Sequence, residues 1–230
     1  MMKKTALFSL LVPAALLVGC HERSAVSGLT VEMLDCPLGV VAEHPRMSWR
    51  IESALPATVQ TGYRILVSTD PGDLETGENL IWDSGDVPSD RSVLVPYEGP
   101  ELESRRDYYW KVRVATNHGD TLWSEPSRWS MALLDDSDWQ ARWIGYDSCL
   151  NRTDTLGVFS RLAARYLRKE FDAGRDIAQA RLYISGLGLY ECYLNGCRVG
   201  EDVLAPTATD YTKTVCYNVY DVTDLLDEGV

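Results

Sequence analysis

Residues that could do acid–base chemistry are numerous in this chain, but they are not grouped. The chain has 34 acidic residues, and paired carboxylates roughly 6.5–9.5 Å apart can hydrolyse glycosidic bonds with inversion. With so many acidic side chains, candidate pairs are plentiful and no spacing selects one. The acidic run 134–138 could suggest a calcium loop, but it lacks the ligand spacing, the glycine and the final glutamate of an EF-hand. We interpret it as a solvated linker.

Other catalytic and metal-binding patterns are missing from the sequence. The histidines His21, His44 and His118 have no partner four residues away, so no H-E-x-x-H motif occurs. There is also no G-x-S-x-G nucleophile elbow. Gly186-Leu187-Gly188 is too short for a phosphate-binding loop and favours strand packing. We therefore assign no catalytic residue, no metal ligand and no cofactor, and the sequence identifies no substrate-binding residue.

The amino terminus has the pattern of an export signal. Lys3-Lys4 precedes the apolar run Ala6–Val18, which is too short to span a bilayer. Leu17–Cys20 resembles a bacterial lipoprotein box, in which Cys20 becomes the lipidated first residue. The alternative is an ordinary cleaved signal with an unrelated cysteine. We predict a signal peptide over 1–20, a tether over 21–28, and a lipid-anchored exported protein in the periplasm or at the outer membrane or cell surface, with the leaflet undetermined.

Cysteines and net charge limit the partners of the exported chain. Export places the chain in a compartment that permits disulfides. Five cysteines follow Cys20, and an odd number leaves at least one free thiol or an intermolecular pair. Cys192 and Cys197 would lie diagonally in a hairpin, about 7–8 Å apart, whereas a disulfide needs roughly 4.4–6.8 Å; we predict two buried thiols. The formal net charge of −12 argues against nonspecific binding of nucleic acid.

The sequence of the first half of the chain predicts a sandwich of about seven short strands. Alternating apolar residues and regular turn signals are typical of an immunoglobulin-like fold. The longest run, Arg106–Thr116, would turn Tyr108, Trp110, Val112 and Val114 inward. The other expected strands are Leu29–Leu34, Arg46–Ile51, Gln60–Ser68, Leu80–Asp83, Ser92–Tyr97 and Arg128–Leu133.

The second half contains a strong hairpin signal at Asn195-Gly196. Both residues tolerate the positive φ that a two-residue type I′ turn requires. This turn would pair Leu194 with Cys197 and Tyr193 with Arg198, and would bury the face that carries both cysteines. Nearby segments are expected to form a helix within Val158–Lys169 and strands at Tyr166–Phe171, Ala180–Ser185, Leu189–Leu194, Cys197–Val199 and Val215–Val222.

Several motifs resemble the amino-terminal β-sandwich of bacterial α-L-rhamnosidases. In the second half they are Leu182–Tyr190, Tyr193–Gly196, Val203–Pro206, Thr209–Tyr211 and Tyr220–Thr223. The first half is similar to fibronectin type III domains and to the module that opens many rhamnosidases, through Pro37–Gly39, Pro45–Trp49, Leu80–Gly85 and the Tyr-Tyr-Trp strand followed by Trp123–Pro126. The resemblance covers roughly residues 29–230.

This resemblance implies an all-β chain, with an immunoglobulin/fibronectin type III-like sandwich over 29–134 and an incomplete, jelly-roll-like second sandwich over 135–230. It also implies an inverting glycoside hydrolase that acts on rhamnose-containing glycans or glycosides and has its catalytic α/α barrel further along the chain. We therefore expect these 230 residues to be a fragment, or the product of a premature stop, and to be inactive alone. The alternative is a lipid-anchored carbohydrate-binding or structural β-sandwich module without activity. The linkage cleaved and the oligomeric state stay open.

Overall fold

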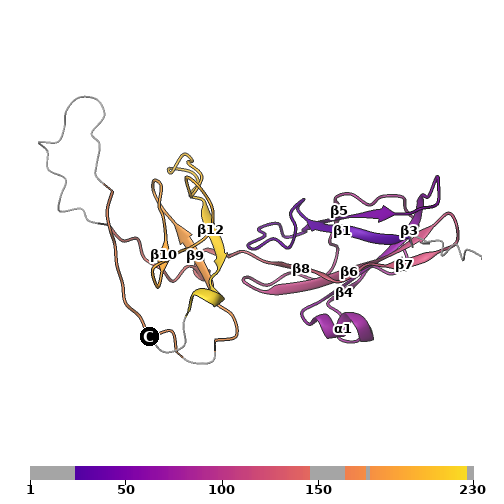
Figure 1. Ribbon diagram of the computed structural model, residues 1–230, viewed down its shortest axis with the longest axis horizontal. Helices are drawn as coiled ribbons and strands as arrows, with labels where there is room; N and C mark the ends of the chain where they lie inside the picture. Colours follow the sequence, from indigo (N-terminus) through magenta and orange to yellow (C-terminus); the bar gives the residue numbers. More distant parts are fainter. Residues whose placement is uncertain (1–23, 146–163, 175–176, 227–230) are drawn as a thin grey trace, which may run out of the picture.

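The computed structural model describes residues 24–145, 164–174 and 177–226. They form two β-rich bodies that follow one another along the long axis of the molecule (Figure 1). The first body is a sandwich of two antiparallel sheets, and the second holds two small antiparallel sheets. The all-β prediction is thus confirmed.

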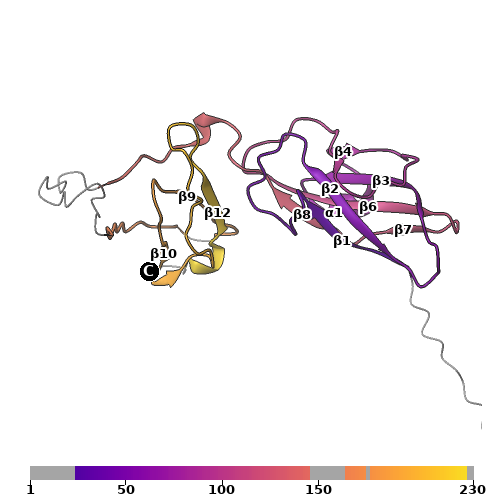
Figure 2. The ribbon, with the colours of Figure 1, turned by 90° about the horizontal axis from the view of Figure 1, so that it is seen from above.

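The first sandwich encloses a core rich in tryptophan. One sheet has the order β1 (Ala25–Val31), β2 (Arg46–Glu52), β5 (Val95–Pro96). The other has the order β4 (Trp82–Asp83), β3 (Gln60–Ser68), β6 (Asp107–Thr116), β7 (Thr121–Trp123), and β8 (Ser127–Ser130) also pairs with β6. The sheets face each other in two layers (Figures 1 and 2). Trp49, Trp110 and Trp129 are almost fully buried between them.

The alternation predicted for the longest strand is confirmed. Tyr108, Trp110, Val112 and Val114 of β6 are all at most 2% exposed. The ring of Tyr108 stacks on Trp129 of β8 with 5.3 Å between centroids. Burying several such side chains contributes roughly 1.5–3 kcal/mol each, so this strand is the centre of the core.

The structure corrects several boundaries in this sandwich. The first strand begins at Ala25 rather than Leu29, and β4, β5 and β8 are shorter than expected. The turn cluster after β3 begins a short helix, α1 (Pro71–Thr76). Asp70 caps it by accepting a hydrogen bond from the Gly72 amide, and Gly77 ends it with φ +75°. These are ordinary start and stop signals for a helix.

The second body contains two two-stranded sheets. Strand β9 (Arg181–Ser185) pairs with β12 (Tyr217–Asp221), and β10 (Tyr193–Leu194) pairs with β11 (Cys197–Arg198). A short 3-10 helix (Asp136–Asp138) precedes this region, and another, η4 (Thr223–Leu225), follows β12. The predicted hairpin register is confirmed, because Tyr193 lies opposite Arg198 and Leu194 opposite Cys197.

Other predictions for the second half were wrong. Cys197 is exposed and Cys192 only partly buried, both as free thiols, because the two-residue strands are too short to build a covered face. Residues 164–174 form neither strand nor helix and are exposed throughout, so Tyr166–Phe171 is not a strand. The part of the expected helix at 158–163 lies outside the described residues. No helix within the described ranges is both long and apolar enough to cross a bilayer.

Candidate functional surfaces

The residues selected from the sequence for possible chemistry do not come together. His44 lies in a loop, with its Nδ1 3.1 Å from the carbonyl oxygen of Tyr97. His118 follows β6, and its backbone amide donates to the Thr116 hydroxyl. Cys20 and His21 lie outside the described residues. Within the described ranges, no three His, Cys, Asp or Glu side chains are grouped as a metal site would require.

The acidic run after the first sandwich is used for local structure. Asp135 caps the 3-10 helix by accepting a hydrogen bond from the Ser137 amide. The side chain of Asp138 in turn accepts a hydrogen bond from the Asp135 amide. Asp138 also accepts from the Ser104 hydroxyl at 2.5 Å, which lowers the pKa of this carboxyl below its usual value. Carboxylates held this way by internal donors are ionised and already partnered, so the run is a structured connection rather than a calcium loop.

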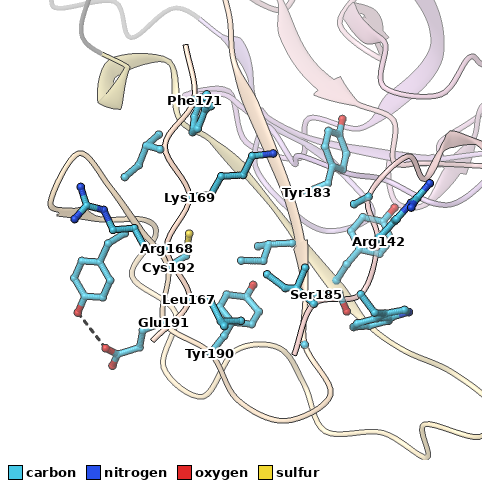
Figure 3. A pocket seen from close by; sticks show the side chains of 18 of the residues that line it. Arg142, Leu167, Arg168, Lys169, Phe171, Tyr183, Ser185, Tyr190, Glu191 and Cys192 are labelled. Atoms are coloured by element: carbon cyan, nitrogen blue, oxygen red, sulfur yellow. Dashed lines mark hydrogen bonds between the residues drawn. The ribbon is translucent and has the colours of Figure 1, made fainter. Parts of the chain in front are cut away.

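A broad hollow lies between residues 164–174 and the sheets of the second body (Figure 3). Its volume is about 2390 Å³, whereas ligand pockets in proteins usually enclose about 300–1,000 Å³. Leu167, Phe171 and Tyr190 contribute apolar surface to it, and Glu191 accepts a hydrogen bond of 3.0 Å from the hydroxyl of Tyr193. A hollow of this size is too wide to enclose a small ligand on several sides at once.

The tyrosines beside the hollow form a hydrogen-bonded group with one carboxylate. The Tyr220 hydroxyl donates to Asp202 Oδ2 at 2.8 Å, and Asn218 links the same carboxylate to Tyr190. Burial, together with the hydrogen bonds to Tyr190 and Asp202, raises the pKa of Tyr220 well above its usual range. The phenol therefore stays protonated at neutral pH and cannot act as a general base. This group stabilises the fold of the second body.

The outer face of the first sandwich carries one exposed aromatic platform. Trp123 on β7 lies opposite Arg113 of β6 and is 43% exposed. The ring centroid is 4.9 Å from Nζ of Lys111 and 5.6 Å from Cζ of Arg113, so two cations support the indole. Lys111 pairs with Glu75 on α1, and Arg113 pairs with Asp86. The result is a half-exposed indole packed against two cations, each of which is paired with a carboxylate.

Two family models match successive parts of this chain. Residues 26–135 match the immunoglobulin domain found at the amino terminus of Rha78A-like proteins. Residues 175–230 match the α-L-rhamnosidase N-terminal domain. Fold and matches together define the class: an immunoglobulin-like domain followed by a rhamnosidase N-terminal domain.

Similar proteins extend this result. An α-L-rhamnosidase of Formosa agariphila is 33% identical over 97% of this chain, and one of Streptomyces avermitilis is 34% identical over 85%. The solved α-L-rhamnosidase of Dictyoglumus thermophilum is 34% identical over 89% of this chain, with a TM-score of 0.78. The chain spans about a quarter of the length of these relatives, 26%, 20% and 24% respectively. It is therefore similar to the amino-terminal portion of α-L-rhamnosidases, and the match does not cover their catalytic domain.

Proposed function

We propose that this chain is the amino-terminal, non-catalytic portion of an exported α-L-rhamnosidase that removes terminal α-L-rhamnose from glycans or glycosides with inversion. The main support for the proposal is the order of the two matches: two domain models, each described as amino-terminal in its family, match this chain one after the other. In this proposal the two β-bodies support a catalytic α/α barrel, and the acid and base lie in that barrel.

The carboxyl groups whose pKa values are shifted are partnered within the fold, which fits a supporting role for these residues. Among the described residues, the perturbed carboxyl groups all have lowered pKa values because they accept hydrogen bonds from arginine, serine, threonine or backbone donors. An inverting glycosidase needs a carboxylic acid whose pKa is raised, so that it is protonated when it meets the leaving group. The carboxyl groups with lowered pKa values stay ionised at neutral pH and do not fit this acid role.

Hydrolysis of an aryl α-L-rhamnoside tests this function. The native gene product, purified from its own cells, should release rhamnose, and a chain of residues 21–230 should release none. Activity of the short chain would show that its own residues carry the acid and base. No activity of the native product on aryl rhamnosides or on rhamnose-rich polysaccharides would contradict the proposed substrate.

We also propose anchoring through a lipid on Cys20, on the evidence of the Lys3-Lys4 and Ala6–Val18 pattern before it. Several acyl chains would hold the protein stably at a membrane surface, whereas a single chain would be marginal. Cys20→Ser should remove incorporation of labelled fatty acid and release the protein from the membrane fraction. Unchanged membrane association of this variant would favour an ordinary signal peptide or another anchor.

The second candidate function is carbohydrate binding without catalysis, and the Trp123 platform favours it. In this case Trp123→Ala should weaken binding of rhamnose-containing oligosaccharides by at least tenfold. The matched control is Trp143→Ala, which removes an exposed indole outside the sandwich. Equal binding by both variants and the unchanged chain would remove the platform from consideration.

A further inference from the structure

The two β-bodies meet at an ion pair that is largely shielded from water. Arg181, at the start of β9, donates through Nη2 to Oδ1 of Asp107 at the start of β6. The same guanidinium donates through Nη1 to the carbonyl oxygen of Arg105 at 3.2 Å. The two side chains are only 8% and 19% exposed. The side-chain amide of Gln179 donates a hydrogen bond of 3.2 Å to the second carboxylate oxygen, so both oxygens of Asp107 accept hydrogen bonds from the second body.

A tyrosine makes the second set of contacts across this junction. The hydroxyl of Tyr217 on β12 accepts a hydrogen bond of 3.0 Å from the backbone amide of Leu133, which follows β8. The ring of Trp139 meets Tyr217 edge to face at 5.2 Å. Although β10 and β11 lie between them in the sequence, β9 and β12 are paired neighbours, so the arginine and the tyrosine are presented by the same small sheet.

Close backbone approach completes the junction. Val219 of β12 lies over Gly39, and a Cβ added at Gly39 would be 2.7 Å from the Cγ2 atom of Val219. The loop that carries Gly39 is tied to β8 by a bond from the Gly39 amide to the Ser130 hydroxyl. A side chain at position 39 would therefore push β12 away from the first sandwich.

The described part of the second body has little core of its own. Between residues 177 and 226, only four residues are buried: Val199, Ala205, Pro206 and Val222. Its sheets are two-stranded, and an isolated two-stranded sheet is marginally stable at best in water. The first sandwich, in contrast, encloses sixteen buried apolar residues in one cluster. The junction therefore adds support for β9 and β12 beyond the hydrogen bonds within the second body.

We infer that this end of the first sandwich, formed by Asp107, Leu133 and Gly39, is an intramolecular docking surface on which the β9–β12 sheet is ordered. The partner it fits is the guanidinium of Arg181 together with the phenol of Tyr217. The two domains then behave as one rigid unit, with the immunoglobulin-like domain acting as a template for the start of the second. This inference does not depend on the proposed enzyme activity, because it concerns only contacts within the chain.

Hydrogen exchange of the full chain, read by mass spectrometry, tests the docking surface. Asp107→Asn keeps the shape of the side chain but removes the charge that faces Arg181. We expect amides of β9 and β12 to exchange at least about tenfold faster, since leaving a buried charge without its partner is strongly destabilising. Exchange in β3 and β6 should stay unchanged, because the core of the first sandwich does not include this pair.

The matched control is Asp83→Asn. It removes another arginine–aspartate pair, Arg64–Asp83, within the first sandwich, where the two side chains are 35% and 32% exposed. This variant should leave exchange in β9 and β12 unchanged. Equal protection of β9 and β12 in Asp107→Asn and the unchanged chain would overturn the inference. Faster exchange in β3 and β6 as well would also overturn it, because Asp107 would then serve the first sandwich itself.

Tyr217→Phe provides a second, milder test. It removes only the hydroxyl that accepts from Leu133, so the variant should fold and the Leu133 amide should lose protection together with β12. Loss of protection at Leu133 and β12 supports docking through this contact. Retained protection of the Leu133 amide would show that the hydroxyl does not hold the junction, and would overturn the role assigned to Tyr217.

Discussion

Gln60 supplies a strong test of how the first sandwich is held together. This polar side chain is only 5% exposed and lies at the start of β3. Its Oε1 accepts from the indole Nε1 of Trp49 at 2.9 Å, and its Nε2 donates to the carbonyl oxygens of Ser89 and Arg91 at 3.0 and 2.8 Å. One amide group thus joins both sheets to the loop before β5. Gln60→Leu keeps the volume but removes all three hydrogen bonds.

The expected cost of Gln60→Leu is about 2–4 kcal/mol in the free energy of unfolding. Leaving the buried indole N–H of Trp49 without an acceptor costs about 1–3 kcal/mol, and each lost bond to a carbonyl removes roughly 0.5–1.5 kcal/mol. The leucine regains part of this through apolar burial. Urea unfolding followed by tryptophan fluorescence measures this change in the free energy of unfolding, and m, its slope against urea concentration, should stay the same.

A double-mutant cycle with Trp49→Phe isolates the indole–amide bond. Trp49→Phe removes the donor, so adding Gln60→Leu should then cost less than it does in the unchanged chain by about 1 kcal/mol or more. A loss of less than about 0.5 kcal/mol for Gln60→Leu alone would show that Gln60 does not hold the two sheets together, since water or another acceptor would then replace it.

Two further predictions concern glycine and acid. Gly200 has φ +71°, and an added Cβ would lie 2.3 Å from Cε1 of Tyr220, so Gly200→Ala should speed hydrogen exchange in β12. Gly196 has φ +81° and open space around it. Gly196→Ala should therefore cost only the roughly 1–2 kcal/mol of a non-glycine residue in a left-handed backbone conformation. Equal exchange in β12 for both variants would contradict this. The hydrogen bond from Arg64 lowers the pKa of Asp83 below its ordinary value of 3.8. The folded chain then binds fewer protons than the unfolded chain, so the contribution of Asp83 is full above about pH 4 and is lost as the pH falls below it. Asp83→Asn should flatten the fall in stability below pH 4, and an unchanged slope in acid titration of unfolding would argue against this pair.

Several features that are set by residues close together in the sequence were predicted correctly. The alternation in β6 and the Asn195-Gly196 turn gave the right faces and the right register, because both are set by residues within one strand or one turn. The helix α1 was missed although Asp70, Pro71 and Gly77 all carry its signals, because a six-residue helix shows too little apolar periodicity to be distinguished from a turn.

Contacts between distant segments could not be predicted in this way. Asp107 and Arg181 are 74 residues apart, and nothing near either of them in the sequence indicates the other. The exposure of Cys197 depends on how many strands cover its face, which a hairpin signal does not report. The platform at Trp123 likewise depends on the register of β6 with β7, which places Arg113 directly opposite the indole.

The intact mass of the native gene product, measured from its own cells, shows whether a catalytic domain is attached to this chain. We expect a polypeptide several domains longer than 230 residues, since this chain matches only about a quarter of the length of similar α-L-rhamnosidases. The carboxylates that act on rhamnose would then be sought after Val230. A mature product that ends at Val230 would contradict an attached catalytic domain and leave carbohydrate binding as the working function.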